Sequence, residues 1–311
     1  MKKSYEIDMC NGPLLGKILV FSIPLMLSGI LQLLFNAADI IVVGRFAGST
    51  ALAAVGSTAS LINLMINVFV GLSVGVNVLA ARYYGAQKEK DIQDTVHTAI
   101  MMAILSGLFL VVLGESASKP MLTLMGTPDD VLDQAALYLR IYFFGMPVLM
   151  IYNFGAALLR AVGDTRRPLY FLFAAGAVNV VLNLFFVIQL GMGVDGVAWA
   201  TVISECVSAG LIIRSLMKEN GAMKLHLTKL RIVSGKLTQI VRVGLPAGMQ
   251  GAIFSISNVL IQSSVNSFGS IAMAGSTASA NVEGFVYNAM NAVYQTTLSF
   301  TSQNYGAGKM D

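Results

Sequence analysis

The chain has 311 residues, of which 56% are hydrophobic and only 12% are charged, and its mean hydropathy is +0.73. Soluble domains have about 25% charged residues because their surface faces water, so this composition excludes an ordinary soluble fold. The formal net charge of +4 does not indicate nucleic-acid binding, because the basic residues are spread among the segments between long apolar stretches.

Eight apolar stretches are each long enough to cross a bilayer, whose hydrocarbon core of about 30 Å takes about 20 helical residues. Strands of a membrane barrel would alternate polar and apolar residues over about ten positions, and these stretches do not. The sequence therefore predicts an all-α integral membrane protein with eight transmembrane helices. In chain order the stretches are 15–43, 52–81, 92–114, 134–158, 168–190, 194–217, 238–266 and 271–303.

The basic residues between these stretches fall mainly on one side of the membrane. If the N-terminus is cytoplasmic, seventeen Lys and Arg lie on the cytoplasmic side and only Arg45 and Lys119 lie outside, with Arg140 near the outer end of the fourth helix. Such a bias follows the positive-inside rule. We therefore expect a multi-pass protein of the bacterial plasma membrane with a cytoplasmic N-terminus.

Two parts of the sequence repeat one another in the same order. Pro24 of the first predicted helix matches Pro246 of the seventh at an offset of 222 residues, and YGAQK at 84–88 returns as YGAGK at 305–309 at an offset of 221. Six predicted helices separate the start of the two copies, so both enter the membrane from the same side. Parallel repeats of this kind are typical of some secondary transporters.

The repeat divides the chain into three expected parts. These are a six-helix N-terminal lobe at 1–217, a cytoplasmic linker at 218–236, and the first two helices of a C-terminal lobe at 237–311. Two complete lobes would have twelve helices, so the second copy stops after its second helix and the chain is expected to be truncated. The alternative is a natural eight-helix protein.

Polar side chains inside the predicted spans are the candidate functional groups, because an ionisable group costs roughly 2.5–3.5 kcal/mol at bilayer depth and usually faces an interior cavity. Counting from the outer helix ends at about 1.5 Å per residue places Asp39, Asn183 and Thr201 within about 3 Å of one another in depth. Asn179 lies about one turn deeper. Carboxylate, amide and hydroxyl oxygens suit a hard cation, and Asp39 could equally carry a proton.

The alternative for these residues is that they only join helices by hydrogen bonds. A neutral residue would do the same at lower insertion cost than Asp39, so a cation-binding or coupling site at Asp39, Asn179, Asn183 and Thr201, with Na⁺ as a possible metal ion, is the preferred interpretation. A further group of polar residues is expected to line a central cavity. Its members are Gln32, Asn36, Glu205, Asn258, Gln262 and Glu283.

Several motifs follow one another along nearly the whole chain. They are IPLMLSGILQLLFNAADIIVVGR in the first predicted helix, the repeated YGAQK and YGAGK, LLRAVGDTRRP after the fourth helix, NVVLNLFFV in the fifth and GVDGVAWATVISE in the sixth. In these motifs the chain resembles the multidrug and toxic compound extrusion (MATE) family.

The resemblance implies a two-lobed, twelve-helix antiporter that exports cationic or amphipathic small molecules in exchange for Na⁺ or H⁺ by alternating access. It also places the family's N-lobe cation site on Asp39, Asn179, Asn183 and Thr201. Family members often have Asp at the position of Asn183, and some have a Glu in the seventh helix, where MQGAIFSISN lacks a carboxylate. We expect a monomer in the lipid bilayer, with small organic substrates and no cofactor apart from the coupling ion.

Two other functions stay open at this point. A flippase for lipid-linked saccharides would need several Arg and Lys near the cleft to hold pyrophosphate, and only Arg140 is near it. A truncated chain could instead be inert or act only as a binding partner. An enzyme is not expected, since His97 and His226 are isolated in the sequence and no GxxxxGK[ST] phosphate-binding motif is present.

Overall fold

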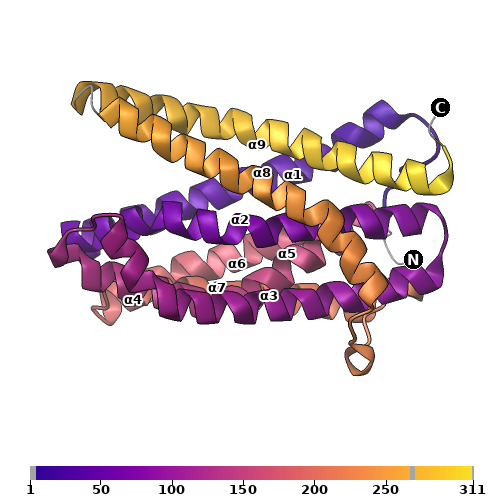
Figure 1. The fold of residues 1–311 in the computed structure, drawn as a ribbon, viewed down its shortest axis with the longest axis horizontal. Helices are drawn as coiled ribbons and strands as arrows, with labels where there is room; N and C mark the ends of the chain where they lie inside the picture. The colour runs from indigo at the N-terminus through magenta and orange to yellow at the C-terminus, as the bar shows by residue number, and fades with distance from the viewer. Residues whose placement is uncertain (1–4, 267–269, 310–311) are drawn as a thin grey trace.

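Each of the eight predicted stretches is helical in the computed structural model, which describes residues 5–266 and 270–309 and contains no strand in that part of the chain. The long helices run side by side along one direction (Figure 1). Their bounds are α1 Leu14–Val42, α2 Ser49–Gly85, α3 Glu89–Leu124, α4 Asp129–Phe144, α5 Met146–Ala161, α6 Arg166–Leu184, α7 Val194–Lys218, α8 Ser234–Asn266 and α9 Ser270–Ala307.

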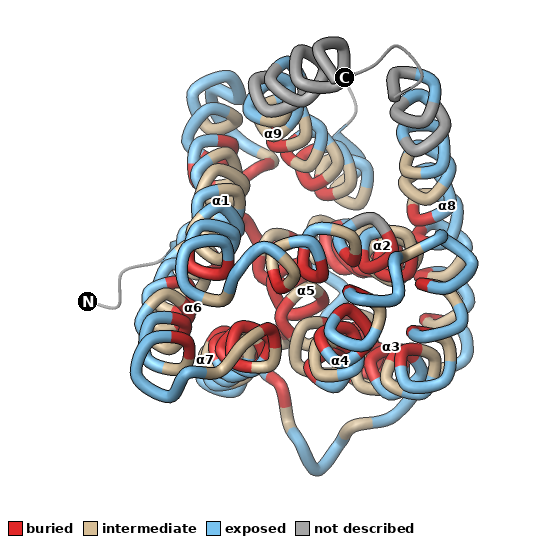
Figure 2. Tube along the Cα trace, turned by 90° about the vertical axis from the view of Figure 1, so that its left-hand side faces the viewer, coloured by how far each residue is buried: buried red, intermediate tan, exposed pale blue. Residues whose placement is uncertain are grey.

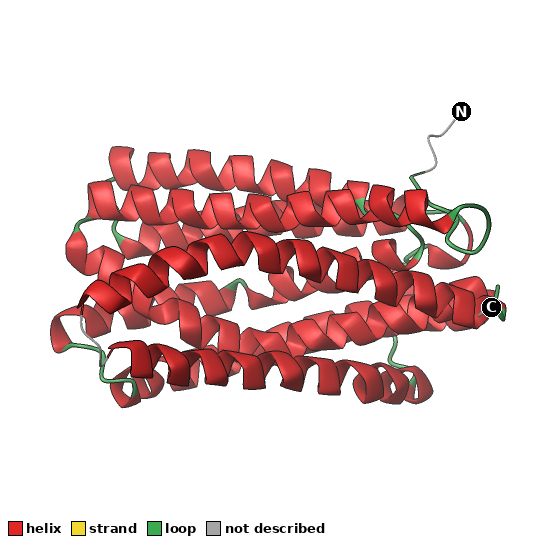
Figure 3. Ribbon diagram, turned by 90° about the horizontal axis from the view of Figure 1, so that it is seen from above, coloured by secondary structure: helices red, strands yellow, loops and turns green. Residues whose placement is uncertain are grey.

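Four short segments complete the described part of the fold. Two π-helical turns, η1 Val43–Ala47 and η2 Phe185–Gln189, extend α1 and α6 at their C-terminal ends. Two 3₁₀ turns, η3 Gly221–Met223 and η4 Leu227–Lys229, lie in the connection between α7 and α8. Figure 3 shows how little of the fold is loop.

Six helices among the described residues are individually long and apolar enough to cross a membrane, and a bent pair makes a seventh if it counts as one span. The eighth predicted stretch corresponds to α9, and several side chains of α9 lie outside the described part of the chain. All-helical membrane architecture is therefore what the structure shows.

The fourth predicted stretch, 134–158, was expected to be one helix, and in this detail the structure differs. It is broken between α4 and α5 by a bend of 48° at Gly145. The cause is Pro147, which has no N–H to donate to the preceding turn and whose ring clashes with the carbonyl of Phe143 in a continuous helix. Pro147 stands instead in the first turn of α5, where a free N–H is not needed.

Helices α2 to α7 enclose most of the buried residues, whereas α8 and α9 lie to one side of them (Figure 2). The two late helices contact this bundle chiefly through α2, and α9 also packs on α1. Where one lobe ends and the next begins stays a prediction, but this packing gives α1 and α2 neighbours in both parts of the sequence repeat.

Glycines allow α2 and α8 to pack with their backbones in contact. Gly71 and Gly75 of α2 face Gly244 and Gly248 of α8, and a Cβ on Gly71 would overlap the main chain of Gly248. Small residues at such crossings are the usual means of close packing between membrane helices.

The contact between α1 and α9 differs in chemistry at the equivalent place. The repeat offsets of 222 and 221 relate Gly244 to Ser22 and Gly75 to Thr296. Ser22 Oγ and Thr296 Oγ1 are both buried and form a hydrogen bond of 2.8 Å. One contact therefore depends on glycine packing, and its counterpart depends on a hydroxyl pair.

We expect Gly71→Leu to lower the stability of the purified protein by about 2 kcal/mol or more, because the new side chain must displace the backbone of α8. Gly56→Leu is the matched control, since Gly56 lies on the same helix with open space where its Cβ would be. Thermal unfolding in detergent measures both variants. Equal midpoints for the two would contradict the packing described.

Candidate cation site in the N-terminal lobe

Three helices carry the four residues for which the sequence predicts a cation site. Asp39 lies in the last turn of α1, Asn179 and Asn183 lie one turn apart on α6, and Thr201 lies on α7. Because α6 packs against both α1 and α7, its two asparagines stand between the other two residues. The structure thus brings all four together.

The four side chains form one chain of hydrogen bonds. Asn183 Nδ2 donates to Asp39 Oδ1 and to Asn179 Oδ1, the latter at 3.3 Å. Asn179 Nδ2 donates to Thr201 Oγ1 at 3.4 Å, and the Thr201 hydroxyl donates to the carbonyl of Val197 at 3.0 Å. The carboxylate at one end is therefore connected through two amides to the hydroxyl at the other.

One atom of this group lacks a partner. Asn183 Oδ1 is buried and accepts no hydrogen bond in the structure, although the asparagine is only 1% exposed. A buried acceptor without a donor is unfavourable by roughly 1–3 kcal/mol, and such an atom in a native protein often marks a place for an ion or a water. This orphaned oxygen is the feature that a bound cation would satisfy.

The donor set also fits a hard cation better than a transition metal. It offers one carboxylate, two amide oxygens and a hydroxyl, which are oxygen ligands. In the part of the chain that the structure describes, no group of three or more His, Cys, Asp or Glu is placed to hold a metal ion. The role of the four residues as ion ligands stays a prediction.

The six residues expected to line a central cavity are more scattered. Gln32 and Asn36 are exposed on α1, Asn258 is exposed on α8, and Glu283 is exposed on α9. The side chain of Gln262 lies outside the described residues. No hydrogen bond joins these exposed residues to one another among the described contacts, so a shared lining is not shown.

Glu205 is the exception, because its carboxylate lies inside the N-terminal bundle. A Cβ on Gly145 would lie 3.3 Å from Glu205 Oε2, which puts this carboxylate at the break between α4 and α5. Because Gly145 has no side chain, the carboxylate can lie close to the main chain there.

Sequence reasoning missed a second polar cluster, at the start of α6 and the end of α7. Arg167 forms ion pairs with Asp164 and Glu219, and its Nη1 donates to Ser215 Oγ at 2.9 Å. Asp164 Oδ1 also accepts the backbone N–H groups of Arg166 and Arg167, each at 3.0 Å. Burial raises the pKa of Asp164, and these donors oppose that shift.

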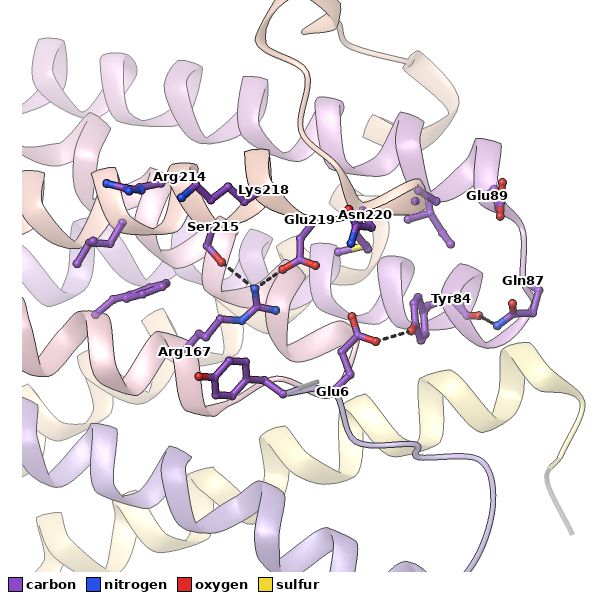
Figure 4. Close-up of a pocket in the computed structure, with 17 residues that line it drawn as sticks. Glu6, Tyr84, Gln87, Glu89, Arg167, Arg214, Ser215, Lys218, Glu219 and Asn220 are labelled. Carbon is purple, nitrogen blue, oxygen red and sulfur yellow. Dashed lines mark hydrogen bonds and ion pairs between the residues drawn. The ribbon is translucent and has the colours of Figure 1, made fainter. Parts of the chain in front are cut away.

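This cluster borders a cavity of about 820 Å³ (Figure 4). Glu6 enters the cavity from the N-terminal segment and accepts a hydrogen bond of 3.2 Å from the Tyr84 hydroxyl. The LLRAVGDTRRP motif contains Asp164 and Arg167 three residues apart at a helix start, and that spacing was the available signal for a capped, ion-paired turn.

The MatE family profile matches residues 24–185, which is more than half of the chain. The chain belongs to the MatE family. It is 31% identical over 301 residues to the "Probable multidrug resistance protein YoeA" of Bacillus subtilis, a match that covers 94% of this chain and 65% of that protein. It is 26% identical to the "FAD transporter" of Shewanella oneidensis, over 97% of this chain and 67% of that protein.

The solved structures show the same similarity in three dimensions. One described as the "Outward-facing conformation of a multidrug resistance MATE family transporter of the MOP superfamily" superimposes with a TM-score of 0.87 at 26% identity, covering 94% of this chain and 65% of that one. The chain thus spans about two thirds of the length of its relatives. This MatE protein is a multi-pass membrane protein whose surroundings are the lipid bilayer.

We expect Asn183→Ala to lower stability by about 1–3 kcal/mol, because the Asp39 carboxylate loses its donor within the membrane. Asn153→Ala is the control, since Asn153 donates only to the carbonyl of Leu149 in its own helix. Thermal unfolding of each variant with and without Na⁺ provides the measurement. If the two variants lose the same stability, the hydrogen bonds around Asp39 do not stabilise the protein more than an ordinary bond within one helix does.

Proposed function

We propose that this MatE protein is a secondary active antiporter of the bacterial plasma membrane, with its N-terminus in the cytoplasm. It exports cationic or amphipathic small molecules in exchange for Na⁺ or H⁺ by alternating access. The observation that carries the proposal is the half-buried carboxylate of Asp39 joined through Asn183 and Asn179 to Thr201. Relatives named as multidrug resistance proteins support the class of cargo.

The coupling step begins at the bond between α1 and α6. A cation or a proton that neutralises Asp39 competes with Asn183 for the carboxylate oxygen. The contact between these two helices changes as a result. A bound ion can drive the cycle only by binding one conformation more tightly than the other, and this bond is a contact on which that difference can depend.

Helix α1 transmits such a change toward the second part of the repeat. It carries Asp39 near its outer end and Ser22, which bonds Thr296 of α9, nearer its inner end. Between them lies Pro24, which interrupts the backbone hydrogen bonds of α1 and allows a local bend. A shift at the cation site therefore reaches the α1–α9 contact along one helix.

The cytoplasmic ends of the two repeats are in contact in this structure. Gln303 Nε2 of α9 donates to the carbonyl of Ala161 at 2.7 Å, and the Arg82 guanidinium stacks over the Tyr305 ring at 4.7 Å. Gly85 and Gly306 allow the helix ends to meet without side chains between them. These contacts must separate before a substrate can enter from the cytoplasm, which makes the arrangement suited to an outward-facing state.

The structure gives little support for the alternative function, binding of a lipid-linked saccharide through its pyrophosphate. Arg140, which the sequence placed near the cleft, forms an ion pair of 2.7 Å with Glu115 on the surface. Its charge is therefore already matched, and a pyrophosphate would have to displace that partner.

Reconstituted vesicles give the test of the coupling role. We expect Asp39→Asn to reduce gradient-driven export of a fluorescent organic cation at least tenfold, because the amide can neither bind Na⁺ strongly nor exchange a proton. Asp130→Asn makes the same change at an exposed carboxylate in the first turn of α4, and it should leave export near the wild-type rate.

The two gradients are imposed separately in the same vesicles. Export supported by either Na⁺ or H⁺ alone identifies the coupling ion. Two results would contradict the proposal, namely unchanged export by Asp39→Asn and the absence of export by the wild-type chain under both gradients, which would favour a chain that is inert by itself.

A further inference from the structure

The connection between α7 and α8 forms a loop that projects sideways from the helical bundle. It leaves α7 after Lys218, contains η3 and η4, and reaches α8 at Ser234. Figure 1 shows this loop standing out at right angles to the helices, and the view along the helices in Figure 2 shows it between α7 and α3, beyond the outline of the bundle. A loop in that direction extends over the surrounding lipid.

Hydrogen bonds fix the depth of this loop in the membrane. The N–H of Leu225 donates to the carbonyl of Leu216 in α7 at 3.0 Å, so the chain folds back beside the helix that it has just left. The N–H of His226 donates to His97 Nε2 at 3.3 Å, and the N–H of Val233 donates to Thr98 Oγ1 at 3.1 Å, both in α3. The loop is thus held at the level of residues 97–98 of α3.

That level corresponds to the inner edge of the hydrocarbon core. Helix α3 has 36 residues and is therefore about 54 Å long. A helix of this length that is centred in a core of about 30 Å, and perpendicular to the membrane, extends roughly 12 Å beyond the core at each end. Thr98 lies about 14 Å along the helix from its first residue, Glu89. The loop consequently lies beside the lipid headgroups of the cytoplasmic leaflet.

The charge of the loop is one-sided. The segment 220–236 has no Asp or Glu and has four Lys and Arg. Two of these are matched by α3, since Arg231 pairs with Asp94 at 2.7 Å and Lys236 pairs with Asp91. Lys224 and Lys229 are exposed and form no ion pair in the described part of the structure. Two free cations therefore remain on the projecting part.

An apolar side chain stands between these two lysines. Leu227 is 49% exposed, whereas Leu225, two residues earlier, is 2% exposed and packs into the bundle. An exposed Leu flanked by Lys is the arrangement by which peripheral segments enter the headgroup region, with the apolar group toward the acyl chains and the charges at the phosphates.

We propose that this loop, residues 221–230, is a binding site for anionic phospholipids of the cytoplasmic leaflet. Lys224 and Lys229 hold the headgroup phosphates, and Leu227 inserts between the headgroups. The bonds from the loop backbone to His97 and Leu216 keep this face turned toward the lipid. The proposal depends on membrane residence and on the cytoplasmic orientation proposed above, and not on the transported cargo.

The test uses the full chain in lipid nanodiscs and a single tryptophan. Trp199 is the one Trp of the chain, so Leu227→Trp is made in a Trp199→Phe background, and its fluorescence reports contact with brominated lipids. We expect strong quenching by brominated phosphatidylglycerol and weaker quenching by brominated phosphatidylcholine at equal mole fraction. Added inorganic phosphate should not compete, because the lipid and not a free anion is the ligand.

Lys224→Gln with Lys229→Gln should lower the preference for phosphatidylglycerol by roughly fivefold for each lysine removed, as expected for a basic residue near an anionic surface. Lys88→Gln with Lys90→Gln is the matched control, and it should leave the preference unchanged. Both lysines are exposed, Lys88 just before α3 and Lys90 in its first turn.

Three results would overturn the proposal: no quenching by either lipid, which places the loop in the cytosol; equal quenching by both; or an equal effect of the two double variants. If the Trp variant does not fold, native mass spectrometry of phosphatidylglycerol retained by the otherwise unaltered chain and by the two lysine variants makes the same comparison.

Discussion

The carboxylate of Asp39, in the last turn of α1, sets a constraint on which the N-terminal bundle depends. Asp39 can be accommodated there only if neighbouring helices supply donors, and Asn183 does so from α6. That requirement fixes the rotation of α6 about its axis, because Asn179 must then face the same way and meets Thr201 of α7. One carboxylate therefore constrains how α1, α6 and α7 face one another.

The same constraint gives the site its chemistry. Satisfying Asp39 with an amide N–H turns Asn183 Oδ1 away from every donor in the structure. A cation between the carboxylate and the amides would relieve both problems at once, since it replaces the donor to Asp39 and gives the amide oxygen a positive neighbour. Because Asn183 Oδ1 lacks a hydrogen-bond donor, the hydrogen bonds of this site are incomplete, and they can be exchanged for bonds to an ion during the proposed transport cycle.

The two contacts between the repeats differ in chemistry, and only one of them involves α1, the helix that carries Asp39. Glycines such as Gly71 and Gly248 hold α2 and α8 backbone to backbone, which resists separation. The counterpart between α1 and α9 depends on the Ser22–Thr296 hydroxyl pair, which can part and find new partners. Because Asp39 lies on α1, the proposed ion binding would act on the more adaptable of the two contacts.

Much of this could be predicted from the sequence, because membrane residence limits the possibilities. Apolar length gave the eight helical stretches, and helical rise placed Asp39, Asn183 and Thr201 at a common depth. The bend at Gly145 was missed because a count of apolar residues does not register the missing N–H of Pro147. The pairing of Arg167 with Glu219 joins two helices across a loop, and no spacing within one helix reveals it.

Gln32 and Asn36 lie on the same face of α1 as Asp39, yet they are exposed. A shared helix face therefore does not predict which of its residues a neighbouring helix contacts. The most direct test of the central claim is equilibrium binding of radioactive Na⁺, together with proton release recorded by a pH indicator, on the purified chain as an organic cation is added. The account predicts that the organic cation displaces about one Na⁺ or one proton from the wild-type protein and none from the Asp39→Asn variant. Equal release from both proteins would contradict it.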